Sequence, residues 1–333
     1  MKLENCELDI DAAAAAPMVR AEPAPEWVAA RDRGLLPEAV FAMYSRSSFF
    51  SFGAAPPFLA DERRFLFSYF AMVLTSLRDA LVDADGELRA FQEDQAQVYD
   101  LGKRIRGENW DPDAPGRARK HFRLLLISLQ ASLDATADLA ALFLTGLIPG
   151  LRVGRAQFSR IETWLGRALP PAGLIITPQR DSLEQLYVTL SPLVNATPPE
   201  REWLPLMRMF RNKAAHLGGA VFRYMALHDA EGRFHTFVPR QWPFIPEEYM
   251  HFADAPARAP AEPFPDLFKR TLVHEDVLSY ASGLRGKVTG VISAALQVLD
   301  GAHRRFKDFP VNAAALAELE GSAEAYAFEH FDA

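Results

Sequence analysis

The feature that most constrains the fold of this chain is a set of long apolar stripes with helical spacing. One stripe begins near residue 61, and two more fall within 117–147 and 266–308. Side chains three or four positions apart lie on one face of an α-helix, so each stripe predicts a long helix with one buried side. The stripes are Leu66, Phe70, Val73, Leu77 and Leu81; Phe122, Leu125, Leu126, Leu129 and Leu133; and Leu284, Val288, Val291, Ile292, Ala295 and Leu299. We therefore expect a mainly all-α protein.

Composition divides the chain into three parts. Residues 1–60 are rich in Ala, Pro and turn-forming residues, so they predict an irregular N-terminal segment, which Trp27 would help to dock onto the body. Residues 61–310 carry the helical patterns and predict one helical domain. An acidic C-terminal tail follows over residues 311–333.

Glycines and a change of period mark boundaries inside the helical domain. Gly86 predicts the end of the first long helix, and a separate polar helix is expected over 87–106. Shorter helices are expected over 156–168 and 181–194. The pattern then changes to aromatic and branched residues around a four-residue loop, which predicts a β-hairpin over about 220–239.

The last stripe contains three glycines that weaken a helix by up to about 1 kcal/mol each relative to alanine. Their small size predicts close approach of another helix at Gly283, Gly286 and Gly290. A further helix should reach residue 217, with a kink or a new start near Pro205, because proline lacks the backbone donor that a helix interior needs.

Charge, cysteine and hydropathy narrow the functional classes. The net charge of −7 disfavours general nucleic-acid affinity, but residues 101–223 hold 17 Lys or Arg and 10 Asp or Glu, a net of +7. This imbalance predicts a local anionic partner, and charges scattered over solvated helix faces explain it equally well. A lone cysteine, Cys6, favours a reducing compartment, so we expect a cytoplasmic protein. The most apolar stretch, 124–147, contains Asp134 and Asp138, so no membrane span is expected.

One short motif carries the chemistry: Arg211-Asn212-Lys213-Ala214-Ala215-His216, just before a pair of glycines. Arginine binds phosphate through a fixed fork of donors, and histidine transfers protons near neutral pH. This pairing suffices to cut RNA without a metal. The alternative is an ordinary helix terminus, where basic residues oppose the negative end of the helix dipole and glycine follows.

Helical geometry limits how the motif can work. Arg211 and His216 lie about 140° apart around a helix, whereas Asn212 and His216 lie about 40° apart and share a face. Arginine and histidine can therefore meet only if the long arginine side chain wraps round the helix, or if two copies of the helix face each other. The second arrangement predicts a dimer with a shared site.

The motif and its helical setting resemble the HEPN superfamily, in which Arg, a polar residue, three variable residues and His occur near a helix end. Members are α-helical bundles that usually dimerise, and many are metal-independent ribonucleases of toxin–antitoxin, anti-phage and RNA-processing systems. The resemblance is strongest over 115–308 and extends to a subgroup with a β-hairpin before the last helix. It implies an antiparallel HEPN-like bundle, a homodimer, RNA as the partner, and no metal or cofactor.

The resemblance also implies roles for individual residues. Arg211 would stabilise charge on the phosphoryl oxygens, His216 would act as general base or acid, and Asn212 would orient the histidine or the phosphate. Attack by the RNA 2′-hydroxyl would leave a 2′,3′-cyclic phosphate. Candidates for further phosphate contacts are Lys213, Arg208 and Arg223.

The chain departs from the family at one position, and two other functional classes compete. Some HEPN toxins have a tyrosine two residues after the histidine, which a partner nucleotidyltransferase modifies, but Gly218 stands here. An antitoxin or a regulatory protein of another type stays an expected partner.

The main alternative to a ribonuclease is a non-catalytic HEPN-like module that binds RNA, a nucleotide or a protein. A metal-dependent oxidase bundle would need two Glu-x-x-His segments, and we find one, from Glu248 to His251.

Overall fold

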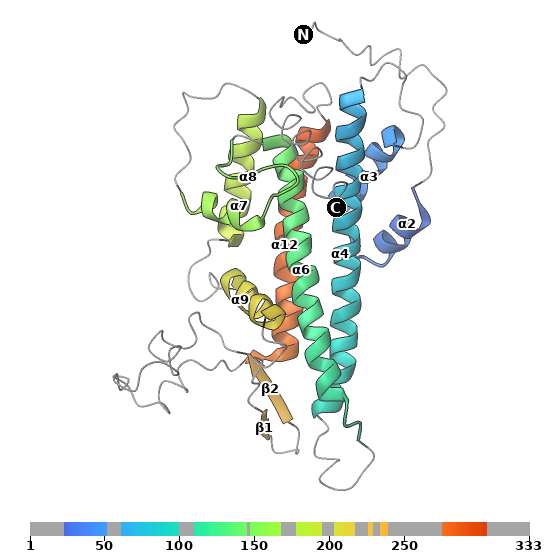
Figure 1. Ribbon diagram of the computed structural model, residues 1–333, viewed down its shortest axis with the longest axis vertical. Coiled ribbons are helices and arrows are strands. Elements are labelled where there is room, and N and C mark those ends of the chain that lie inside the picture. Colours follow the sequence, from blue (N-terminus) through green and yellow to red (C-terminus); the bar gives the residue numbers. More distant parts are fainter. Residues whose placement is uncertain are drawn as a thin grey trace, which may run out of the picture. The chain divides into compact units, whose positions relative to one another are not determined.

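The described part of the protein is mainly helical, which confirms the expectation of a mainly all-α protein. The computed structural model (Figure 1) describes residues 23–51, 61–99, 110–144, 147–167, 178–194, 203–216, 226–228, 234–238 and 275–304. Its helices are α2 Pro25–Asp32, α3 Glu38–Ser51, α4 Asp61–Tyr99, α6 Ala114–Leu144, α7 Phe158–Leu165, α8 Pro178–Val194, α9 Trp203–His216 and α12 Val277–Arg304. The acidic tail predicted over 311–333 lies outside the described residues.

The chain divides into two compact units. Helices α4, α6 and α12 each contribute one segment to both units, so each unit is built around parts of the same three long helices. Unit 1 comprises Met1–Leu81, Ala131–Pro192 and Gly290–Ala333, and unit 2 comprises Val82–Gln130 and Leu193–Thr289.

Unit 1 has an apolar core in which aromatic rings join neighbouring helices. Phe70 of α4 meets Phe143 of α6 edge-on, with ring centroids 6.1 Å apart, and both side chains are buried. Trp164 of α7 and Tyr187 of α8 make a similar edge contact at 5.4 Å. Such edge-to-face pairs stabilise the core beyond the area that they bury.

The first two helices correct the expectation of an irregular N-terminal segment, because residues 25–32 and 38–51 are helical. Trp27 of α2 is 1% exposed and stacks on Tyr44 of α3, with ring centroids 3.7 Å apart. The guanidinium of Arg78 on α4 lies 5.1 Å from the Trp27 ring centre, within cation–π range. The Ala- and Pro-rich composition misled the prediction, since Ala favours helices and proline fits the first helical position.

Unit 2 is held together by aromatic side chains from four helices. Phe91 of α4 lies 5.2 Å from Phe122 of α6, which lies 6.4 Å from Tyr280 of α12. Tyr280 in turn meets Phe210 of α9 nearly perpendicularly at 6.2 Å. Helix α9 is thus attached to α12, and Tyr280 links this contact to Phe122 of α6.

A small sheet also belongs to unit 2. Strand β1, Ala226–His228, pairs antiparallel with β2, Phe234–Val238, and β2 pairs antiparallel with β3, Glu275–Asp276. Residues 220–225 and 229–233 lie outside the described part. The hairpin predicted over about 220–239 therefore stays a prediction in its extent and in its loop.

Two predicted helix boundaries are wrong. Helix α4 runs without interruption from Asp61 to Tyr99, so Gly86 neither ends it nor begins a separate polar helix. Helix α12 begins at Val277, not near residue 266, because Asp276 caps it: its Oδ1 accepts hydrogen bonds from the backbone N–H of Leu278 at 2.9 Å and of Ser279 at 3.4 Å.

The cap of α12 is itself held from a distant part of the chain. The hydroxyl of Tyr99, the last residue of α4, donates to Asp276 Oδ2 at 2.5 Å. Burial and the neighbouring Asp276 carboxylate raise the pKa of Tyr99 above its ordinary value, so the phenol stays protonated and keeps this bond. The end of α4 and the start of α12 are thereby fixed to each other within unit 2.

By length and hydropathy, α6 is the one helix in the described part of the chain that is able to cross a membrane. Inside the protein, 61% of its most apolar window is buried. The core helix of a soluble protein passes the same test, so this finding is weak evidence for a span.

Candidate functional site

The motif that carries the predicted chemistry forms the last turns of helix α9. This helix begins at Trp203 and ends at His216, which confirms the prediction that Arg211 to His216 are helical. Pro205 lies in its first turn, where the backbone N–H that proline lacks would have had no helical partner. Residues 195–202 lie outside the described part, so the choice between a kink and a new helix start near Pro205 stays a prediction.

The buried face of α9 fixes the motif on unit 2. Trp203, Leu204, Met207 and Phe210 are all at most 6% exposed. Phe210 directly precedes the motif, and its ring packs against Tyr280 of α12. Burial of a large aromatic side chain contributes about 1.5–3 kcal/mol to the stability of the fold. Phe210 therefore holds the end of α9 in place one residue before Arg211.

The structure describes two of the six predicted site side chains. Arg208 and Arg211 are half-buried, and each interacts with neighbouring groups. Asn212, Lys213 and His216 lie on the helical backbone, and their side chains are outside the described part. The third candidate phosphate contact, Arg223, lies wholly outside it. Convergence of the arginine and histidine on one cleft therefore stays a prediction.

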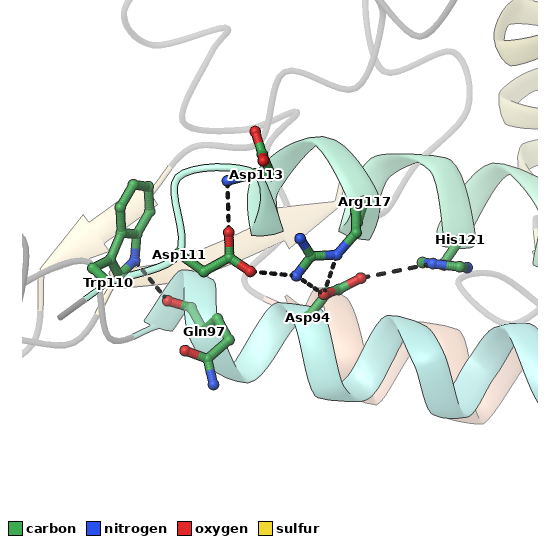
Figure 2. Close-up of polar contacts among 7 residues, drawn as sticks. All are labelled: Asp94, Gln97, Trp110, Asp111, Asp113, Arg117 and His121. Atoms are coloured by element: carbon green, nitrogen blue, oxygen red, sulfur yellow. Dashed lines mark hydrogen bonds and ion pairs between the residues drawn. The ribbon is translucent and has the colours of Figure 1, made fainter.

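A second polar cluster in unit 2 was not predicted from the sequence (Figure 2). Arg117 of α6 donates through Nε and Nη2 to Asp94 Oδ1 of α4, at 2.9 and 2.6 Å. Its Nη2 also donates to Asp111 Oδ2 at 2.7 Å. His121 Nδ1 lies 2.6 Å from Glu87 Oε2, and its Nε2 lies 3.7 Å from Asp94 Oδ2.

This cluster has the electrostatics of a structural clamp. Hydrogen bonds from Arg117 and from the backbone N–H of Asp113 lower the pKa of Asp111. Hydrogen bonds from Arg117 to the same carboxylate and to Asp94 raise the pKa of the guanidinium. The indole N–H of Trp110 donates to the Gln97 carbonyl at 3.0 Å, as Figure 2 shows. Together these contacts join the end of α4 to the start of α6.

The chemistry of His121 is constrained by the same contacts. A carboxylate on one imidazole nitrogen orients the ring, as in catalytic triads. Here, however, the other nitrogen lies 3.7 Å from Asp94 Oδ2, and the Asp94 carboxylate already binds Arg117. Both ring nitrogens therefore face carboxylates of the same cluster. We read His121 as part of the clamp between α4 and α6.

The carboxylates of Asp134 and Asp138 hold a loop in unit 1. Asp134 Oδ1 accepts a hydrogen bond from the Phe158 N–H at 2.9 Å, and Asp138 Oδ1 accepts one from the Ala156 N–H at 3.2 Å. Burial raises the pKa of Asp138 to about 6; the backbone N–H groups of Ala156 and Gly154 oppose this rise, and repulsion from Asp134 adds to it. These carboxylates bind backbone and so have a structural role.

Metal ligation is a further role that acidic and histidine side chains can have. Over the residues that the structure describes, no group of three or more His, Cys, Asp or Glu side chains is placed to hold a metal ion.

Comparison with models of protein families, with curated proteins and with solved structures finds no match to this chain.

Proposed function

We propose that this protein is a metal-independent endoribonuclease of HEPN type. The observation that carries the proposal is the Arg-Asn-x-x-x-His motif at the end of α9, in a protein whose described part is mainly helical. Arg211 binds the scissile phosphate and stabilises the charge that develops on its oxygens. His216 transfers the proton of the 2′-hydroxyl or of the leaving group, and Asn212 orients the reacting groups.

The reaction uses the RNA itself as nucleophile. The 2′-oxygen loses its proton and attacks the adjacent phosphorus, and the bond from phosphorus to the 5′-oxygen breaks. The products are a 2′,3′-cyclic phosphate and a 5′-hydroxyl end. DNA lacks the 2′-hydroxyl and is therefore not a substrate.

The proposal includes the setting and the partners of the enzyme. The active form is a homodimer whose two copies of α9 share the site, since Arg211 and His216 lie about 140° apart on one helix. The biological setting is bacterial toxin–antitoxin biology or anti-phage defence in the cytoplasm, with an antitoxin or regulatory protein as a second partner. The HEPN-like bundle with its β-hairpin supplies the scaffold.

The test is cleavage of mixed cellular RNA by the purified full chain in EDTA, with the fragment ends mapped. Wild-type protein should produce ends with 2′,3′-cyclic phosphate. His216→Ala should reduce the rate by about 10²–10⁴-fold, the usual contribution of general acid–base catalysis. Arg211→Lys should also lose most activity, since lysine keeps the charge but not the fork of donors.

His330→Ala is the matched control, since it makes the same chemical change far from the motif in sequence. It should cleave like the wild type. Equal RNA patterns for wild type and His216→Ala would reject cleavage at this site, and the non-catalytic binding module would become the better description.

A further inference from the structure

One face of α6 in unit 2 carries three basic side chains that have no acidic partner among the residues that the structure describes. Arg119 and Lys120 are exposed and Arg123 is half-buried, and within the described part of the chain none of the three forms an ion pair. At 100° per residue they span an arc of about 100° on the helix. We call these three residues the basic face of α6.

The composition of this face does not serve the stability of the helix. Arg119 and Arg123 are four residues apart, and Lys120 and Arg123 are three apart, so like charges are neighbours on the surface. No acidic residue stands three or four positions from any of them. Elsewhere in unit 2, on α4, the exposed Arg89 pairs with Asp85 four residues before it, as stabilising helix faces usually do.

The clamp around Arg117 lies beside this face on α6 and occupies the nearby carboxylates. Arg117, one turn before Lys120, is neutralised by Asp94 and Asp111, so those two carboxylates already serve another cation. The basic face therefore keeps its positive charge, although the chain as a whole has a net charge of −7. A concentrated positive field on an acidic protein favours an anionic ligand at that place.

We propose that the basic face of α6 binds the phosphate backbone of single-stranded RNA, an inference that rests on the proposed ribonuclease function. Arg119 and Arg123 are about 6 Å apart along the helix axis, so they can contact different phosphates of one strand. The face belongs to the same unit as α9 and its motif. The RNA is thus held through its backbone, without regard to base sequence.

The small exposed apolar surface beside the basic face favours RNA over a lipid surface. Membrane-binding helices combine basic residues with a broad apolar face that enters the lipid. Beside the basic face, Ile127 is a single exposed large apolar residue, 39% exposed, and the other large apolar side chains described on this helix are buried or half-buried. A polyanionic strand needs no such apolar face.

The test uses the full chain with His216→Ala, so that bound RNA is not cut. Binding of a fluorescein-labelled oligouridine is followed by anisotropy across a series of KCl concentrations. Adding Arg119→Gln, Lys120→Gln and Arg123→Gln together should raise Kd at least about tenfold at low salt. The slope of log K against log salt should fall by about 2, because each phosphate that a basic side chain neutralises contributes about 0.7 to the slope for single strands.

Two matched variants control for charge and for folding. Arg152→Gln, Arg155→Gln and Arg160→Gln remove the same charge from exposed positions of unit 1, and they should leave Kd within about twofold. Arg119→Lys with Arg123→Lys keeps the charge of the basic face, so its salt slope should match the parent protein. A triple variant of the basic face with an unchanged circular dichroism spectrum and weakened binding supports the proposal.

Other results would show that the basic face of α6 does not bind RNA. An unchanged Kd for the triple variant, or equally weakened binding by the unit 1 control, overturns the basic face as the RNA surface. Tighter binding to phosphatidylserine vesicles than to oligouridine at the same salt also overturns it. If the same three glutamine substitutions, made in the chain that keeps His216, leave the rate of RNA cleavage at the wild-type value, only this inference fails. If RNA binds as expected but the wild type leaves it intact, only the proposed cleavage fails.

Discussion

The fold makes the carboxyl group of Asp138 a weaker acid than an exposed aspartic acid. Burial raises its pKa to about 6 from 3.8, although backbone N–H groups donate to its carboxylate. The folded state therefore binds this proton more tightly than the unfolded state does. The resulting stability is fully present below about pH 3.8, declines as the pH rises through the window up to about 6, and is absent above it.

Replacing this carboxyl group with an amide should change how stability depends on pH. Asp138→Asn keeps an oxygen acceptor for the Ala156 N–H but carries no charge to bury. We expect its Tm to exceed that of the wild type by about 2–4 °C at pH 7.5, equivalent to about 1 kcal/mol after allowance for partial solvent screening. The gain should shrink at pH 4.

The exposed Asp83→Asn is the control, because its carboxyl lies on the solvent side of α4 and its substitution should change Tm little at either pH. Thermal unfolding followed by circular dichroism compares the three proteins. A difference between Asp138→Asn and the wild type that is the same at both pH values would show that Asp138 is not the titrating group.

At the scale of elements, the three glycines of α12 behave differently from the expectation. They are exposed, and a Cβ placed on Gly283, Gly286 or Gly290 would meet nothing within 4 Å. The prediction that they permit close approach of another helix is therefore wrong for the described residues. They weaken α12 without a packing role that the structure shows.

Gly286→Ala should consequently stabilise the protein by about 0.5–1 kcal/mol, because alanine loses less backbone entropy in a helix. The free energy of unfolding in urea measures this gain. Gly34 provides a control of opposite sign: its φ is +69°, so Gly34→Ala should destabilise the protein. Lower stability of Gly286→Ala would reveal a contact on this face of α12.

The elements also show what a sequence can predict here. Long stripes with helical spacing identified the bodies of α4, α6 and α12, since burial of one face is periodic. Their ends were less predictable, because they depend on distant partners: Tyr99 holds the cap of α12 from 177 residues away. Gly86 does not break α4, since its cost of about 1 kcal/mol is offset by buried neighbours such as Leu88.

The candidate site combines local features, which a sequence pattern predicts, with contacts between distant residues, which it does not. The motif was found because its six residues are contiguous, and its helical backbone followed from local pattern. The clamp around Arg117 was missed, because Asp94 lies 23 residues away and nothing local links the two. A signal was nevertheless present: the dense basic run around Arg117 on α6 requires either acidic partners from elsewhere or an anionic ligand.

At the scale of the whole molecule, the motif raises the question of how many copies form one site. Arg211 and His216 lie about 140° apart on α9, so a site that uses both residues directly is most easily formed by two helices from two copies. In a two-fold symmetric dimer, each of the two sites then takes Arg211 from one copy and His216 from the other.

Mixing two inactive variants tests this arrangement. In a dimer of one Arg211→Ala copy and one His216→Ala copy, one composite site lacks both residues and the other is complete. Equal mixing of exchanging subunits gives heterodimers in half of the molecules, so activity should return to about a quarter of the wild-type rate. Each variant alone should stay inactive. If both residues of a site came from the same copy, no heterodimer would contain a complete site and the mixture would stay inactive too, so the recovery of RNA cleavage on mixing separates a shared site from two independent ones.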